Sequence, residues 1–206
     1  MTAQYLFRQV FPLHGGETIL YHAAAGGVGL VACQWAKAIG VTMIGTVSTE
    51  AKAEVARAHG CAHAIVTGGM TADDMAREIP KRVKELTGGR GVDVVYDPVG
   101  GDYAEPAIRS MAWNGRYLVI GFASGPIPKI PLNLTLLKGC SIVGVFWGRF
   151  TGEEPAVHLQ NISELWELFA SGKLNPVVTD VFPLEKYQDA YNCMIERRAR
   201  GKRQPA

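Results

Sequence analysis

The chain has 206 residues, of which 48% are hydrophobic and 19% charged. This composition is typical of a folded domain, alone or with part of a second, and excludes a disordered chain. The formal net charge of +2 predicts no strong attraction to nucleic acid or to an anionic membrane. No apolar run is long enough to span a bilayer, the first residues do not resemble a secretion signal, and the four cysteines form no CxxC pair. We therefore expect a cytoplasmic protein with reduced thiols.

Short apolar segments alternate with helical patterns along most of the chain. The predicted strands are Thr18–His22, Thr42–Val47, Ala62–Val66, Val92–Asp97, Tyr117–Gly121 and Ser141–Phe146. The predicted helices between them are Gly27–Ile39, Glu50–His59, 71–87 and Tyr103–Met111, with Pro80 dividing the third or opening its second part. Continuous apolar strands separated by helices indicate a parallel sheet covered on both faces. The expected fold is α/β, a doubly wound (Rossmann) six-stranded parallel sheet.

The C-terminal part of the chain has a different pattern. It is predicted to contain a helix at Glu164–Ala170, a strand at Val177–Val181 and a helix at Glu185–Arg200, followed by the polar sequence GKRQPA. We therefore divide the chain into a Rossmann domain, residues 1–172, and a C-terminal strand–helix segment, residues 173–206.

The sequence AAAGGVG joins the first predicted strand to the first predicted helix. Gly26 would let the backbone approach a pyrophosphate, and Gly29 would let the helix pack closely on the strand. The amides near Gly27 and Val28 would then face the phosphates at the helix N-terminus. Ala24 takes the place of the first glycine of G-x-G-x-x-G. Small residues that serve packing alone therefore remain an alternative.

The end of the second predicted strand bears on the choice of cofactor. NAD sites usually have a carboxylate there, whereas this strand ends with Thr46, Val47 and Ser48. The Ser48 hydroxyl and the Lys52 ammonium could instead bind a 2′-phosphate, which favours NADP. Two alternatives remain open: Glu50 could bind a ribose hydroxyl, and Lys52 could be an ordinary surface lysine.

Several separate motifs resemble one family. HAAAGGVGLVACQWAKAIG, GVDVVYDPVGG and LLKGCSIVGVFWG, together with MTAQYLF at the start, resemble the quinone oxidoreductase (zeta-crystallin-like) branch of the medium-chain dehydrogenase/reductase superfamily. The resemblance covers nearly the whole chain. It implies NADPH-dependent hydride transfer to a quinone or another electron-poor double bond. No residue of the chain stands out as a catalytic acid or base.

Family members carry a GroES-like catalytic domain before the segment that resembles MTAQYLF. The resemblance therefore implies that this chain is mainly a cofactor-binding domain. In the family, the strand equivalent to Val177–Val181 and a final strand return to the catalytic domain. Because the final segment here is GKRQPA, Val177–Val181 could lack its sheet. The family also pairs the sixth strand across a dimer, so a homodimer is expected.

The resemblance also implies a set of cofactor contacts. The pyrophosphate would be held by Gly26, Gly27, Val28 and Gly29, and the 2′-phosphate by Ser48 and Lys52. Arg198 also reaches that phosphate in some members, although it could equally be one of several bases at a solvated helix end. Thr67 stands where some members have a tyrosine beside the adenine. The residues expected near the nicotinamide are Thr2, Val99, Gly121, Phe122 and Phe146.

Several alternatives to this function are open. A non-catalytic NADP-binding module and an enoyl reductase of the same superfamily remain alternatives. His59, Cys61 and His63 alternate in HGCAH, but a helix is expected to end at Gly60 and a strand to begin, so the three side chains need not converge and no metal is expected. The basic residues 197–203 are expected to be a solvated helix end rather than a nucleic-acid site.

Overall fold

The computed structural model describes residues 1–196 and 200–205. Its centre is a sheet of six parallel strands in the order β3-β2-β1-β4-β5-β6. The strands are β1 (Thr18–His22), β2 (Thr42–Val47), β3 (His63–Val66), β4 (Val92–Asp97), β5 (Met111–Val119) and β6 (Ser141–Gly144). This is the strand order of a doubly wound fold, so the predicted fold class is confirmed.

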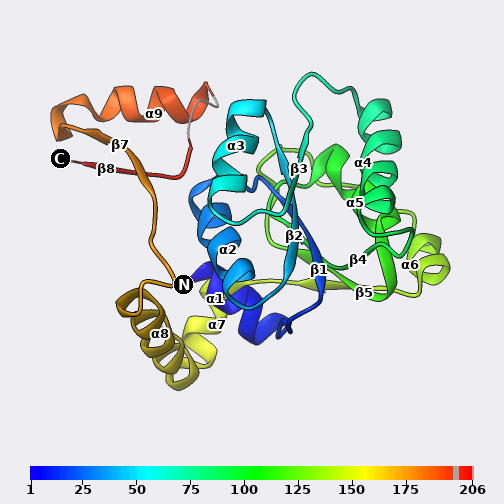
Figure 1. The fold of residues 1–206 in the computed structure, drawn as a ribbon, viewed down its shortest axis with the longest axis horizontal. Coiled ribbons are helices and arrows are strands. Elements are labelled where there is room, and N and C mark those ends of the chain that lie inside the picture. Colours follow the sequence, from blue (N-terminus) through cyan, green and yellow to red (C-terminus); the bar gives the residue numbers. More distant parts are fainter. Residues whose placement is uncertain (197–199, 206) are drawn as a thin grey trace.

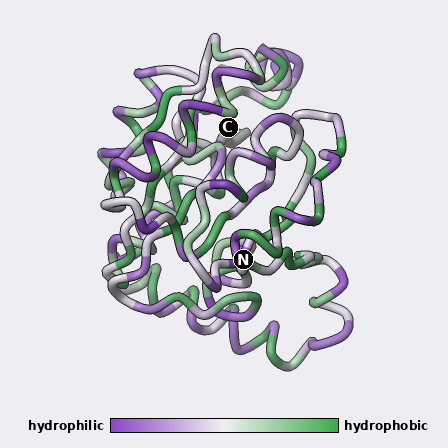
Figure 2. Tube along the Cα trace, turned by 90° about the vertical axis from the view of Figure 1, so that its right-hand side faces the viewer, coloured by the Kyte–Doolittle hydropathy of each residue, from purple (hydrophilic) through white to green (hydrophobic). Residues whose placement is uncertain are grey.

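Helices cover both faces of this sheet, as Figure 1 shows. They are α2 (Gly27–Ala38), α3 (Glu50–Ala58), α4 (Ala72–Leu86), α5 (Ala104–Arg109) and α6 (Asn133–Lys138). Alternate residues of each strand point to opposite faces. Ile19 accordingly packs in one buried cluster with Trp35 of α2, whereas Leu20 packs in the other with Ile79 of α4 and Ile108 of α5. Figure 2 shows hydrophobic stretches in green through the middle of the molecule.

The N-terminal residues pack on the α2 side of the sheet. A short helix, α1 (Thr2–Gln4), continues into one π-helical stretch, Tyr5–Val10. Its Phe7 is fully buried, with its ring centroid 5.1 Å from that of Tyr96. Arg8 and Gln4 bind α8 (Pro155–Ala170) through the carboxylate of Glu164, at 2.8 and 2.9 Å. The first ten residues therefore join α8 to the body of the domain.

Several predicted boundaries are wrong. Ser141–Phe146 ends as a strand at Gly144, and Phe146 instead precedes a helix, α7 (Trp147–Glu153). The predicted helix Tyr103–Met111 ends at Arg109, because Met111 already pairs with Val92 as the first residue of β5. A register shift follows, so that Val94 pairs with Arg116. The helix predicted at Glu164–Ala170 begins nine residues earlier, at Pro155, since proline is well tolerated in a first helical turn.

Pro80 does not divide its helix. The N-terminus of α4 has a capping box. The Thr71 hydroxyl accepts the Asp74 amide, and the Asp74 carboxylate accepts the Thr71 amide. Met75 and Ile79 before the proline and Val83 after it are buried in the same cluster. Packing on both sides of Pro80 therefore maintains one helix despite the lost backbone donor.

The C-terminal segment forms a second, two-stranded sheet. It contains β7 (Val178–Phe182), α9 (Tyr187–Ile195) and β8 (Lys202–Pro205), and β7 pairs with β8 in parallel. The expectation that Val177–Val181 lacks a sheet is therefore wrong, because the polar end of the chain itself supplies the pairing strand. The tail also returns to the glycine turn, where the Gly201 amide donates to the Ala25 carbonyl at 2.9 Å. Within the described chain, no helix is long and apolar enough to cross a membrane.

Candidate nucleotide-binding site

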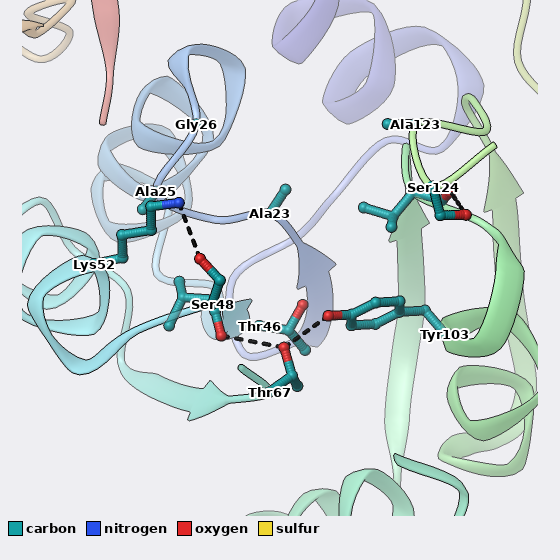
Figure 3. A pocket seen from close by; sticks show the side chains of 12 residues that line it. Ala23, Ala25, Gly26, Thr46, Ser48, Lys52, Thr67, Tyr103, Ala123 and Ser124 are labelled. Atoms are coloured by element: carbon teal, nitrogen blue, oxygen red, sulfur yellow. Dashed lines mark hydrogen bonds between the residues drawn. The ribbon is translucent and has the colours of Figure 1, made fainter. Parts of the chain in front are cut away.

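A cavity of about 330 Å³ opens at the carboxyl ends of the central strands. It lies where β1 is flanked by β2 and β4, the point at which chain connections turn to opposite sides of the sheet. Ligands of doubly wound proteins bind at this position. The lining residues are Ala23, Ala25, Gly26, Thr46, Val47, Ser48, Lys52, Thr67, Val99, Tyr103, Ala123 and Ser124 (Figure 3).

The turn between β1 and α2 forms one wall. Ala23 has a left-handed backbone, φ 59°, and its carbonyl accepts the Gly26 amide at 3.0 Å. A Cβ atom on Gly29 would lie 2.4 Å from the Ala24 carbonyl oxygen, so only glycine lets the helix start this close to the turn. The first amides of α2 have no carbonyl within the helix to bond, and the helix dipole makes this end positive. This end of α2 favours an anion, and the C-terminal tail lies against the same turn, with Gly26 and Gly201 in a parallel bridge.

A lysine and a serine face each other at the end of β2. Thr49 caps α3, and one turn into the helix the Lys52 Nζ donates to the Ser48 Oγ at 2.9 Å. Glu50, the residue that could have bound a ribose hydroxyl, pairs instead with Arg57 at 2.6 Å and does not line the cavity. Within the described part of the chain, no carboxylate lines this cavity. An ammonium beside a hydroxyl suits a phosphoryl group.

Thr46, Thr67 and Tyr103 contribute polar side chains to the lining, and the buried His22 contacts Thr46 and Tyr103 from behind the lining. The Nδ1 of the fully buried His22 lies 2.9 Å from the Thr46 Oγ1. Burial lowers the pKa of His22 to about 4, with a smaller opposing effect of Asp97, so the imidazole is neutral at pH 7. Beside it, the Thr67 and Tyr103 hydroxyls are 2.7 Å apart (Figure 3).

Asp97 shapes the opposite wall. Its carboxylate accepts the amides of Val99 and Gly100, each at 2.7 Å, and also the hydroxyl of Tyr117. Burial, reinforced by this carboxylate, raises the pKa of Tyr117, so the phenol stays protonated as a donor. The buried Asp97 carboxylate therefore holds the turn after β4 in place, and this turn places Val99 in the lining of the cavity.

The structure brings together some of the residues predicted for the site. Gly26, Ser48, Lys52 and Val99 line the cavity, and Gly27, Val28 and Gly29 form the adjoining start of α2. Gly121 and Phe122 lie against the turn after β4 but outside the lining: a Cβ on Gly121 would be 3.2 Å from the Pro98 oxygen.

The remaining predicted residues lie elsewhere. Phe146 is 70% exposed in front of α7, and Thr2 begins α1; neither lines the cavity. Arg198 lies outside the described residues. Residues 1–196 and 200–205 contain no group of three or more His, Cys, Asp or Glu side chains that could hold a metal. In HGCAH, the His59 Nδ1 bonds to the Val55 carbonyl at 2.7 Å, so this nitrogen is not directed at a metal site shared with Cys61.

Sequence reasoning missed Tyr103, Ala123 and Ser124 as lining residues. They follow the carboxyl ends of β4 and β5, the position where ligand-binding residues of parallel sheets concentrate. That position is the signal that could have identified Tyr103, four residues beyond Val99.

The sheet order, the glycine turn and the cavity at the switch point together define an α/β protein of the dinucleotide-binding type. Residues 27–167 match the family model described as zinc-binding dehydrogenase, and the chain belongs to this family. The predicted kinship with its quinone oxidoreductase branch is likewise confirmed. The family's description names zinc, but the described residues of this chain bring no zinc ligands together.

Two curated relatives and one solved structure illustrate the similarity. A quinone oxidoreductase of Pseudomonas aeruginosa is 40% identical over 201 residues, covering 98% of this chain and 60% of that protein. A 2-haloacrylate reductase of a Burkholderia species is 37% identical, covering 98% and 59%. The crystal structure of Escherichia coli quinone oxidoreductase complexed with NADPH has a TM-score of 0.82 at 34% identity, covering 97% and 60%. The chain thus spans about 60% of the length of these proteins.

Proposed function

We propose that this chain binds NADPH and is the cofactor-binding part of an oxidoreductase that reduces quinones or other electron-poor double bonds. The observation that carries the proposal is the Lys52–Ser48 pair at the end of β2, in a cavity whose described lining has no carboxylate. NAD sites use a carboxylate at this position, whereas a 2′-phosphate needs donors and positive charge.

Each wall of the cavity has a role in this proposal. The start of α2, with Gly26 and the amides of Gly27 and Val28, would hold the diphosphate. Lys52 and Ser48 would hold the 2′-phosphate. The turn after β4, fixed by Asp97, would present Val99 toward the nicotinamide half. Thr2, Gly121, Phe122, Phe146 and Arg198 remain proposed contacts with the cofactor.

The similar proteins support the choice of cofactor and reaction. The Escherichia coli quinone oxidoreductase, which shares this fold at 34% identity, was crystallised with NADPH. When bound, reduced nicotinamide supplies a hydride to an electron-poor double bond, and one proton from water completes the two-electron reduction. The chain's own residues bind and orient the cofactor. Within the cavity, no carboxylate of the described chain is positioned as a general acid or base.

Two rival functions remain. One relative is named 2-haloacrylate reductase, and this similarity favours an activated carbon–carbon double bond as the substrate of this chain. An enoyl reductase acts on such a bond and is therefore one rival function. A non-catalytic NADP-binding module would retain the glycine turn and Lys52 without turnover. Because the chain spans about 60% of its relatives, activity belongs to the proposal.

A steady-state assay separates these functions. NADPH oxidation is followed with a small quinone, with 2-chloroacrylate and with an α,β-unsaturated thioester, each against a substrate-free control. Turnover with the quinone above that control is the expected result. NADPH binding without any turnover would favour the module, and neither binding nor turnover would contradict the proposal.

We also propose a homodimer that pairs β6 of two copies. In the described chain no strand pairs with the outer side of β6. Large apolar side chains are exposed on β6 and on the neighbouring α6, namely Ile142, Leu136 and Leu137. An unpaired strand edge flanked by exposed apolar residues is a template for association.

The division of the chain into residues 1–172 and 173–206 is likewise proposed. It is supported by the separate β7–β8 sheet. The curated relatives are longer than this chain, and we propose that the segment equivalent to residues 173–206 packs against their additional part. The cytoplasmic location stays a prediction.

A further inference from the structure

Tyr103 is an aromatic residue in the lining of the cavity and has no role in the proposal so far. It lies at the end of the short turn Gly101–Tyr103, immediately before α5. Figure 3 shows its ring extending from this turn toward Thr67. The side chain is partly buried, so its ring is held by protein yet still borders the cavity.

The hydrogen bonds around Thr67 determine how the phenol is held. The Thr67 hydroxyl donates its proton to the Val47 carbonyl at 3.1 Å. A threonine hydroxyl has one proton, so the Tyr103 hydroxyl must be the donor in the 2.7 Å contact between the two side chains. Val47, Thr67 and Tyr103 thus form a directed chain that fixes the ring at the end of β2 and β3.

The ring is also supported by His22. The two ring centroids are 5.0 Å apart with an interplanar angle of 62°, an edge-type contact. His22 is fully buried, and its lowered pKa of about 4 keeps it uncharged at pH 7. Tyr103 therefore has protein on the His22 side and lines the cavity with the rest of its ring.

The position of the ring selects a part of the ligand. If the start of α2 holds the diphosphate and Lys52 with Ser48 holds the 2′-phosphate, the adenosine ribose lies between them. The base on that ribose then enters the part of the cavity lined by Thr67 and Tyr103. Aromatic side chains stack on nucleobases because both have an apolar, polarisable face.

We propose that Tyr103 is the stacking surface for the adenine base and that Thr67 is its positioning residue. This inference rests on the proposed binding of NADPH. It gives the adenine subsite an aromatic residue from the turn before α5, whereas Thr67, at the end of β3, orients the ring without itself stacking.

Calorimetric titration of adenosine 2′,5′-bisphosphate tests the inference without requiring turnover. Tyr103→Leu should weaken binding of this ligand on the order of tenfold, and Tyr103→Phe, which keeps the ring but loses its hydrogen bond to Thr67, should weaken it only severalfold. Thr67→Val should weaken it severalfold, and Thr67→Ser should restore it. Reduced nicotinamide mononucleotide, which has no adenine, should bind all variants as it binds the parent chain.

The outcomes separate this inference from the proposed function. If the parent chain prefers NADPH but Tyr103→Leu binds adenosine 2′,5′-bisphosphate equally well, the stacking role is wrong and the function stands. Equal weakening of the mononucleotide would show a general structural role and would also overturn the inference. A parent chain that binds neither ligand contradicts the proposed function itself. Should Tyr103→Leu fail to fold, a crystal structure of the parent chain with NADPH decides: adenine must lie against Tyr103.

Discussion

His22 shows how burial determines the charge of a side chain that contacts the cavity lining. It is the last residue of β1, fully buried, and bonded through Nδ1 to Thr46, while its Nε2 has no hydrogen-bond partner among the described residues. Protonation would place a charge in a site shielded from water, which disfavours the charged form more than Asp97 favours it. His22 therefore supports Thr46 and Tyr103 as a neutral ring, and acid should destabilise this region.

This gives a prediction for stability against pH. The pKa of His22 falls from an ordinary 6.5 to about 4 in the folded chain, so between these values the unfolded chain binds more protons. The free energy of unfolding should therefore rise with pH across this window, by roughly 3 kcal/mol for this residue. Urea unfolding at pH 4 and pH 7 measures the change. His22→Gln, which cannot titrate, should show a smaller difference between the two pH values; an equal difference would refute the assignment.

Individual site residues were predictable where they depend on local sequence. Gly26 lies in a strand–helix turn, and Ser48 with Lys52 follows the end of β2, so position in the chain alone directed them to the cavity. Tyr103 and Ser124 were not predicted, because they come from loops whose paths depend on contacts made after folding. One such contact is the Ser124 hydroxyl bond to the Val99 carbonyl at 2.8 Å.

At the scale of elements, the buried strands were the most predictable part. β1, β2 and β4 have the predicted boundaries, because short apolar runs rich in β-branched and aromatic residues favour strands. β8 was missed because KRQP has no apolar pattern, and its strand conformation comes from pairing with β7. Local propensity cannot show a strand that another segment induces.

The edge strand β6 gives a prediction at this scale. If two copies pair through it, light scattering after size-exclusion chromatography should give twice the 22.3 kDa mass of the chain. Ile142→Glu should shift the protein to the monomer, because a charge at the edge opposes pairing. Trp166→Glu on α8, which also replaces an exposed hydrophobic residue, is the matched control and should remain dimeric. A monomeric parent chain would contradict the proposed dimer.

At the scale of the whole molecule, both ends of the sequence pack beside α2. The N-terminal residues pack against α2 and β4, and the C-terminal strand β8 follows Gly201, which bonds to the turn at Ala25. A Cβ atom on Gly27 would lie 3.1 Å from the Lys202 Cγ, so the tail passes directly beside the start of α2. The proposed diphosphate position is therefore bordered by residues far apart in sequence, an arrangement that the local patterns did not predict.

The central claim is that the end of β2 recognises a 2′-phosphate. Calorimetric titration of the parent chain and of Lys52→Glu with NADPH and NADH tests it most directly. The parent chain should bind NADPH at least about tenfold more tightly than NADH, since hydrogen bonds to charged groups contribute this much. Lys52→Glu should lose that preference with NADH little changed. Equal affinity of the parent chain for both cofactors, or equal loss of both in the variant, would contradict the account.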